Sequence, residues 1–393
     1  MKKIFKHIIK VAAILIMIIC WILAIGYTNE LGLRKNTFNI YLEDGAYNVL
    51  DFYNLRNQEK NEDEIISFTG WYEKENQQVV NSNFNRTINT NVVLICGNSS
   101  LVVNGPLLFD DDKNGCLLDE KTAQELFGNI NVIGNTIKYG DRELVVRGIH
   151  KGMDNTVIVQ ALEDSNDKIQ GISIDISKDK KENIKLLKER YGFNDQGVNS
   201  KIYYNIGKFS ISILPIVILL GIIINIMKLA ILNKNKPVAI ILSIIFLMAS
   251  IIIFSKITRY KITIPVDILP NKWSDFDYWK KLYDECLMKI EYFIYMRKYS
   301  IDRYCISYLI KIALCTIITL SLYFINIKNI KIENTKKLFI LSLVMIVITY
   351  IALIICTRSS IDEKELVTIW GMPIYYLICK YMIFKKEKLL TYN

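Results

Sequence analysis

Hydrophobic residues are concentrated in six runs that contain almost no charged residues. The runs cover residues 11–27, 209–227, 238–254, 306–325, 338–356 and 367–384. Each has about 17–20 residues, which is the length of an α-helix that crosses a hydrocarbon core of about 30 Å. Buried helices of a soluble protein rarely come in such a set. The pattern therefore predicts an α-helical membrane protein with six transmembrane helices.

The chain between the first two runs has a different pattern, in which short apolar groups alternate with polar turn residues. The polar stretch 28–64 predicts one or two helices leaving the membrane, and 179–191 predicts an amphipathic helix. Residues 65–205 together predict one mixed α+β domain, inserted between transmembrane helices 1 and 2, with a subdomain boundary near 161–168. Strands are expected at 65–72, 77–80, 91–97, 156–160 and 171–176, and near 201–204.

The strongest local signals of this domain lie in residues 107–149. Asp119 can cap a short helix over 120–127, and Gly128 can end it. A hairpin then pairs 135–139 with 143–149. Because glycine comes first at the reversal Gly140–Asp141, a type II′ turn is favoured. These signals agree with one another and predict a compact α+β unit.

The segment 256–304 separates the third and fourth runs and has a pattern of its own. Pro265 and Pro270 predict an extended approach, and Ser274 with Asp277 forms a capping box. Apolar and aromatic residues from Trp279 onward recur at helical spacing, opposite charged ones. We expect an amphipathic helix in the outer membrane interface; packing against the α+β domain is the alternative.

Charge divides along the same boundaries. Residues 28–207 hold 20 Lys/Arg against 27 Asp/Glu, whereas the rest of the chain holds 29 against 12, so the net +10 does not indicate a nucleic-acid partner. If the four basic clusters all face the cytoplasm, six spans alternate with both termini inside. Residues 28–207 and 256–304 are then extracytoplasmic. The clusters contain Lys2, Lys3, Lys6 and Lys10; Lys228, Lys234 and Lys236; Lys328, Lys331, Lys336 and Lys337; and Lys385, Lys386 and Lys388.

The expected organisation is therefore as follows. Residues 1–27 form a cytoplasmic tail and the first span, which is interpreted as an uncleaved signal anchor. The extracytoplasmic domain occupies 28–207. Spans two and three occupy 208–255, the extracytoplasmic loop 256–304, and the last three spans with a cytoplasmic tail 305–393.

The sequence contains no recognisable catalytic or metal-binding motif. There is no GxxxxGK[ST], HExxH, CxxC or GxSxG pattern, and the only histidines are His7 and His150. The acidic run 110–112 could suggest calcium, but three consecutive acids in a turn are more often solvated. Cys96 and Cys116 could form a disulfide; two separately buried thiols are favoured. Neither a catalytic site, a cofactor nor a metal is therefore expected in this chain.

A family resemblance is carried by the acidic turn followed by GCLLDEKTAQELFG (115–128), NVIGNTIKYG (131–140) and ELVVRGI (143–149). FTGWYEK (68–74) and NVVLICGNSSLV (91–102) precede them in order. This layout resembles the MacB-like periplasmic core domain of ABC transporter permeases (MacB/FtsX-type) in its Gram-positive form, over roughly residues 1–230. The motif residues, read as structural, are Gly115, Cys116, Asp119, Thr122, Ala123, Leu126, Phe127, Gly128, Gly134, Gly140, Arg147 and Gly148.

The resemblance implies a permease subunit of an ABC-type exporter or mechanotransmission complex in the cell membrane. A separate ABC ATPase would supply ATP hydrolysis, and the permease would form a homodimer or heterodimer. Five spans follow the domain here, against three in the usual family arrangement. The candidate ATPase contacts are Lys6, Lys10, Lys234 and Lys236. Two alternatives remain open: a membrane-anchored extracytoplasmic binding or sensor protein without transport activity, and an integral-membrane enzyme based on the loop 273–279.

Overall fold

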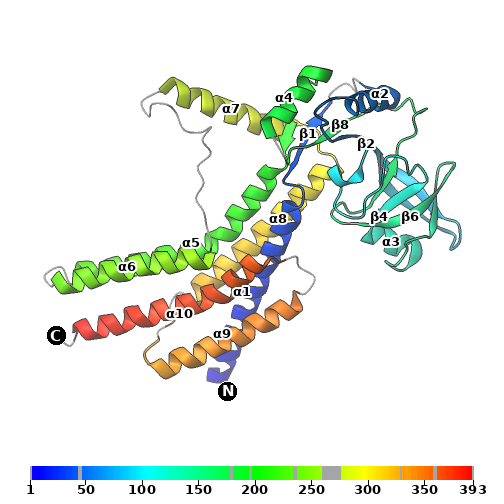
Figure 1. The fold of residues 1–393 in the computed structure, drawn as a ribbon. Helices are drawn as coiled ribbons and strands as arrows, with labels where there is room; N and C mark the ends of the chain where they lie inside the picture. Colours follow the sequence, from blue (N-terminus) through cyan, green and yellow to red (C-terminus); the bar gives the residue numbers. More distant parts are fainter. Residues whose placement is uncertain are drawn as a thin grey trace. The chain divides into compact units, whose positions relative to one another are not determined.

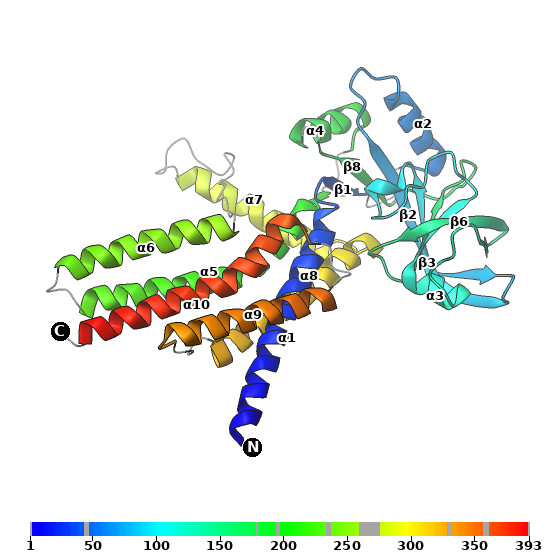
Figure 2. The same ribbon diagram turned by 60° about the horizontal axis from the view of Figure 1, so that its bottom comes forward.

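A computed structural model describes residues 2–42, 47–177, 180–193, 197–232, 237–258, 276–327, 330, 332–356 and 361–391. The chain divides into two compact units. The membrane unit contains Met1–Asn29, Asn205–Leu269 and Tyr308–Asn393, and the sheet unit contains Glu30–Tyr204 and Pro270–Ser307. Figures 1 and 2 show their elements from two sides. The expectations for Pro265, Pro270 and Ser274, and for Lys234 and Lys236, fall outside the described residues.

The described part of the sheet unit contains nine strands, of which six close into a ring. The pairings run β2–β3–β7–β4–β6–β5 and back to β2, with β3–β7 and β4–β6 parallel. The ring strands are β2 (Phe68–Asn81), β3 (Arg86–Cys96), β4 (Gly115–Asp119), β5 (Thr136–Tyr139), β6 (Arg142–His150) and β7 (Thr156–Gln160).

A three-strand extension joins the ring through β2, whose 14 residues serve both parts. Its first residues pair with β8 (Gly171–Asp175), and its last ones, Val79 and Val80, pair with β5. Beyond β8 lie β1 (Thr37–Tyr41) and then β9 (Gly197–Asn199). The helices of this part are α2 (Val49–Glu59) and α4 (Lys180–Tyr191). The region 161–168 lies between ring and extension, so the two parts meet there but share β2.

The interior of the sheet unit is filled by alternate residues of the strands, as expected when one face of each strand is buried. Cys96 on β3 and Cys116 on β4 are both fully buried within it. Both are free thiols, which confirms the favoured interpretation and excludes a disulfide. Burial raises the pKa of each to about 12, so neither is a ready nucleophile.

The local predictions for 119–149 are confirmed. Helix α3 covers Glu120–Phe127, and Asp119 Oδ1 accepts hydrogen bonds from the backbone N–H of Lys121 (3.0 Å) and Thr122 (3.2 Å). Strands β5 and β6 are joined by two residues. Gly140 has φ +57° whereas Asp141 has no positive φ, which fits a type II′ turn and not type I′.

Three expectations for the rest of the domain are wrong in detail. Residues 37–41 form strand β1 rather than helix, because they pair with β8 and β9 from far along the chain. The strand expected near 201–204 lies at Gly197–Asn199, and Lys201 already begins a helix. The two strands expected at 65–72 and 77–80 are one strand, β2, interrupted by a bulge near Asn76.

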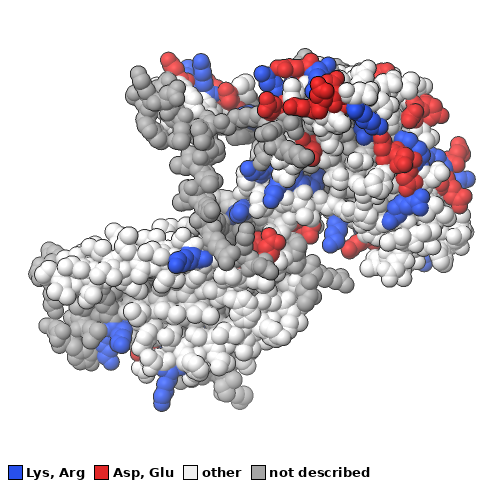
Figure 3. All heavy atoms as spheres, viewed as in Figure 1, with Lys and Arg blue, Asp and Glu red and all other residues white. Residues whose placement is uncertain are grey.

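Among the described residues there are six helices that are long and apolar enough to cross a membrane, as predicted. Their surface carries few charges on the face drawn in Figure 3, whereas both signs cover the sheet unit. The helices are α1 (Lys2–Gly32), α5 (Lys201–Leu232), α6 (Pro237–Thr258), α8 (Ser300–Leu322, followed by a π-helical turn Tyr323–Ile327), α9 (Thr335–Ile355) and α10 (Glu363–Thr391). Helices α1, α5 and α8 each extend from the membrane unit into the sheet unit.

Contacts within the membrane unit fit an alternating topology. The C-terminal ends of α1 and α6 meet the N-terminal parts of α8 and α10, as they must if successive helices cross in opposite directions. The contacts are Asn29 with Glu365 (2.6 Å), Tyr27 with Tyr308 (ring centroids 5.4 Å) and Thr368 with the carbonyl of Ile257 (3.0 Å).

Pro215 in α5 has a structural partner on another helix. Proline has no N–H, so the carbonyl four residues earlier, that of Ile211, loses its intrahelical donor. Trp21 Nε1 of α1 donates to this carbonyl at 3.3 Å. The carbonyl group that Pro215 leaves without an intrahelical donor therefore gains a hydrogen bond from α1. Such a partner is needed because an apolar environment offers no water to this carbonyl.

Candidate functional site

The first turn of α8 is anchored in the sheet unit by a set of buried polar contacts. Although α8 continues as a membrane helix, its residues up to Ser307 belong to the sheet unit. Two carboxylates, one on a strand and one on α8 itself, organise the contacts. We call the set the α8 clamp; its residues are Tyr41, Glu73, Tyr203, Ser300, Asp302 and Arg303.

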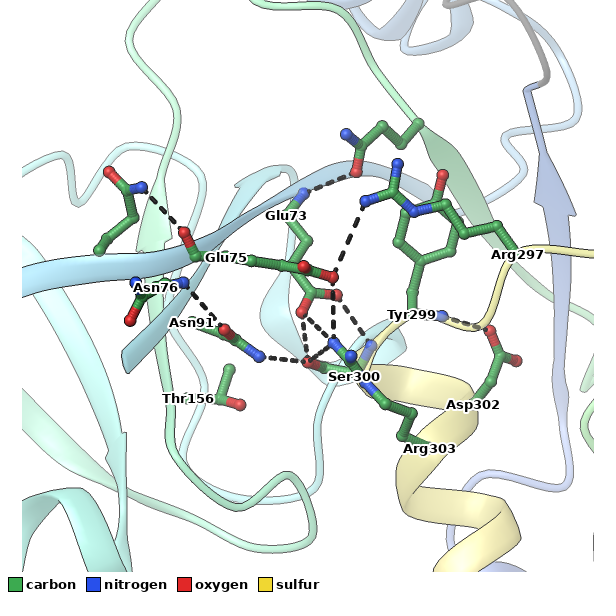
Figure 4. A network of polar contacts seen from close by, with 12 residues as sticks. Glu73, Glu75, Asn76, Asn91, Thr156, Arg297, Tyr299, Ser300, Asp302 and Arg303 are labelled. Atoms are coloured by element: carbon green, nitrogen blue, oxygen red, sulfur yellow. Dashed lines mark hydrogen bonds and ion pairs between the residues drawn. The ribbon is translucent and has the colours of Figure 1, made fainter. Parts of the chain in front are cut away.

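Glu73 on β2 forms the first half of the clamp (Figure 4). Its side chain is 2% exposed. The carboxylate accepts from Ser300 N (2.8 Å), Ser300 Oγ (2.5 Å) and Arg303 (2.7 Å). Ser300 is the first residue of α8, so its N–H has no acceptor inside the helix. Glu73 thus caps the N-terminus of α8 from a strand that is far away in sequence. Its negative charge also interacts favourably with the helix dipole at this end.

A bulge in β2 completes this half of the clamp. The pairing of β2 with β3 shifts between Lys74 and Gln77, and Asn76 has φ +53°. The Asn76 N–H donates to Asn91 Oδ1 (3.2 Å), and Asn91 Nδ2 donates to Ser300 Oγ (3.4 Å). The extra residue therefore brings β2 and β3 together onto the start of α8 (Figure 4).

Asp302 forms the second half of the clamp. It is 1% exposed and accepts from the Tyr41 hydroxyl (2.6 Å), the Tyr203 hydroxyl (3.3 Å) and the backbone N–H of Tyr299 (3.3 Å). Tyr41 lies on β1 and Tyr203 on α5, so this carboxylate joins three elements. Burial, and then the Asp302 charge, raise the pKa of Tyr41 well above its usual value, so Tyr41 remains a hydroxyl donor.

Aromatic rings pack around these polar groups. Tyr299 stacks on Tyr41 with ring centroids 6.0 Å apart, and it meets Trp71 edge-on at 5.0 Å. Trp71 and Glu73 project from the same face of β2, since strand residues two apart share a face. Tyr72 between them belongs to the interior of the sheet unit. The start of α8 therefore covers the face of β2 that the core leaves open.

A glycine admits the next turn of α8. Gly152 in the β6–β7 loop has φ +114°, and a Cβ there would lie 2.6 Å from the Tyr304 ring. Any larger residue would displace this tyrosine.

The chain just after α1 is also anchored in the sheet unit. The buried Arg34 donates a hydrogen bond to the carbonyl of Leu101 at 3.3 Å.

The motif residues of the sequence analysis lie elsewhere, in β4, α3, β5, β6 and their connections. Asp119 caps α3, Arg147 pairs with Asp112 at 2.7 Å, and Gly128 takes the left-handed conformation at the end of α3. Thr122, Ala123 and Leu126 are buried beside Asp119, and Phe127 is partly buried. The remaining residues, Gly115, Cys116, Gly134, Gly140 and Gly148, lie in or beside β4, β5 and β6. They belong to the ring and not to the clamp.

Two residues of the acidic run 110–112 form ion pairs with arginines. Asp110 pairs with Arg56 at 2.6 Å, and Asp112 pairs with Arg147. Among the described residues, no group of three or more His, Cys, Asp and Glu side chains could hold a metal ion. Of the candidate ATPase contacts, Lys6 and Lys10 lie on α1, and Lys10 is exposed.

Sequence reasoning did not find the clamp. Glu73 and Glu75 interrupt an apolar strand, and Ser300, Asp302 and Arg303 stand directly before an apolar run, which is an available signal. However, Glu73 and Ser300 are 227 residues apart, and nothing local pairs them.

No family model and no curated protein matches the chain. Solved structures that are similar to it include the following two. The periplasmic region of MacB from Actinobacillus actinomycetemcomitans covers 44% of this chain and 92% of its own length, with 22% identity and a TM-score of 0.35. The extracellular domain of the noncanonic ABC-type transporter YknZ from Gram-positive bacteria covers 42% and 100%, with 16% identity and a TM-score of 0.31. Both are domains of the kind that the sequence motif predicted.

Proposed function

We propose that this chain is a permease subunit of an ABC-type exporter or mechanotransmission complex in the cell membrane. A separate ATPase binds on the cytoplasmic side, where both termini lie, and the sheet unit is extracytoplasmic. The observation that carries the proposal is the α8 clamp, in which a membrane helix begins on the buried Glu73 of β2.

The clamp suits the transmission of movement. Glu73 is 2% exposed, whereas its ion-pair partner Arg303 is 48% exposed. If α8 moved away and left the Glu73 carboxylate buried without its partners, the unpaired charge would cost about 3–5 kcal/mol. A shift of α8 is therefore expected to displace β2 rather than to separate Ser300 from Glu73. Strand β2 belongs both to the ring and to the extension, so a displacement reaches both parts of the sheet unit.

The energy source in this proposal is a partner protein. The chain has no GxxxxGK[ST] sequence, so it cannot bind nucleotide in the manner of a P-loop ATPase. Lys6 and Lys10 on α1, together with Lys234 and Lys236, are the proposed contacts for the ATPase. A dimer of permease subunits is part of the same proposal.

Affinity purification from native membranes tests the partner. We expect a nucleotide-binding ABC subunit to copurify with the tagged chain in stoichiometric amounts. If none copurifies in any mild detergent or in nanodiscs, the alternative of a membrane-anchored extracytoplasmic binding or sensor protein is favoured instead.

Hydrogen exchange on the copurified complex tests the coupling. We expect vanadate-trapped nucleotide to change exchange in peptides containing β2. Glu73→Gln should abolish that change while ATP hydrolysis continues, because an amide cannot replace the carboxylate toward Ser300 and Arg303. Glu75→Gln is the matched control, since Glu75 is on the same face but half exposed. Equal responses in both variants would contradict transmission through the clamp.

A further inference from the structure

Helix α7 (Phe276–Tyr295) has an apolar face that no described residue buries. At 100° per residue nine of its side chains, all apolar or aromatic, fall on one arc of about 140°, opposite the charged ones, whereas Met288 lies among the charged residues. Tyr283 is 63% exposed, Ile290 54% and Ile294 62%. The arc contains Phe276, Trp279, Leu282, Tyr283, Cys286, Leu287, Ile290, Phe293 and Ile294. A face of this extent requires a partner.

Another helix of the same unit shows how the core covers such a face. Helix α4 buries Leu187 completely and packs Ile184, Leu186 and Tyr191 against the interior. At the C-terminal end of α7, Phe293 of the arc meets Tyr203 of α5 with ring centroids 5.8 Å apart. Five large hydrophobic side chains of the arc are exposed, namely those of Phe276, Tyr283, Leu287, Ile290 and Ile294.

We propose that the apolar face of α7 binds the lipid surface, lying in the outer interface of the membrane that α6 and α8 cross. Four residues separate α7 from α8, and four residues span at most about 14 Å. The contact with Tyr203 also fixes the end of α7 beside the first turn of α5. Both neighbours are the first turns of membrane-spanning helices, so α7 stays near the membrane.

The composition of α7 suits lipid better than a second protein. Seven of its 20 residues are aromatic, including Trp279 and four tyrosines, and Trp and Tyr are enriched where a bilayer meets water. It has three lysines and four acidic residues, so its net charge is not positive. Binding should therefore come from apolar burial, with little preference for anionic lipid.

Cys286 provides the probe, because it lies on the arc and is the one cysteine of the eight classed as exposed. A nitroxide on Cys286 of the full-length protein in phosphatidylcholine vesicles should be relaxed strongly by oxygen and weakly by a water-soluble nickel chelate. Adding phosphatidylglycerol should leave the ratio unchanged. In a Cys286→Ser background, Glu285→Cys places the label on the charged face and should reverse the ratio.

Equal access of nickel to both positions would overturn the proposal, because the arc would then be in water. Dipolar broadening between Cys286 labels at low protein density would also overturn it, in favour of a second copy as the partner. Ile290→Glu, on the exposed part of the arc, should make position 286 accessible to nickel if lipid is the partner. None of these readings requires an ATPase, so they stand apart from the transport proposal.

Discussion

Helices α7 and α8 follow one another with only residues 296–299 between them, yet they are held in opposite ways. The first turn of α8 is fixed by buried carboxylates from β2 and from α8 itself. Helix α7 has no buried residue, and its Phe293 contacts Tyr203 of α5. The amphipathic spacing of α7 thus predicts that a helix forms there. The buried polar contacts of α8 determine that its first turn is fixed to the sheet unit.

The largest effect is expected from Glu73→Ala. It removes a charged acceptor that is 2% exposed and takes three hydrogen bonds from Ser300 and Arg303. Arg303 is 48% exposed and stays hydrated. Because a hydrogen bond to a charged group contributes about 1.5–3 kcal/mol, the free energy of unfolding of the sheet unit should fall by about 3 kcal/mol. Hydrogen exchange of peptides from β2 and α8 in nanodiscs measures this. Glu75→Ala, at an exposed pair, should change stability by about 0.5 kcal/mol or less. Similar losses in both would mean that the clamp contributes no more than a surface ion pair.

A smaller loss is expected from Tyr41→Phe. The substitution removes the shortest hydrogen bond to Asp302, 2.6 Å, and keeps the ring that stacks on Tyr299. Hydrogen bonds to charged groups contribute about 1.5–3 kcal/mol. Tyr203→Phe removes a longer bond, 3.3 Å, and should cost less. The reverse order in thermal unfolding would show that α5, and not β1, holds Asp302.

Mild acid should weaken the ring. His150 at the end of β6 is fully buried, and its Nε2 lies 3.0 Å from the Thr156 carbonyl. Burial lowers its pKa despite the nearby Asp119 and Asp154. Below a pH of about 6.5 this histidine becomes protonated in the unfolded state but stays neutral in the folded state. The free energy of unfolding therefore decreases as the pH falls further. Exchange protection in β6 and β7 should therefore fall with pH.

The neutral variant His150→Gln is the control for this acid effect. It has no ionisable group at the position, so the fall in protection between pH 7 and pH 5 should become smaller in β6 and β7. An unchanged pH dependence in this variant would assign the acid sensitivity to another group.

The contrast between local and distant signals also explains what the sequence could predict. Asp119, Gly128 and Gly140 each act within a few residues, so α3 and the hairpin were predictable. The six spans were predictable because a bilayer demands apolar length alone. Strand β1 was not, since Phe38 and Ile40 gain their partners from β8 and β9, more than 130 residues away. The contact between Glu73 and Ser300 was unpredictable for the same reason, because the two residues are 227 positions apart.

The smallest effect is expected from Ile290→Ala in α7. Ile290 is 54% exposed, so the protein loses almost no packing, and stability should change by about 0.5 kcal/mol or less. Leu187→Ala in α4 is the matched control: its side chain is fully buried, and the loss should be about 2–5 kcal/mol. Thermal unfolding in detergent compares the two. In lipid vesicles Ile290→Ala should still loosen α7, which exchange in residues 276–295 would report. A loss for Ile290→Ala in detergent as large as for Leu187→Ala would mean that protein, and not lipid, covers this face.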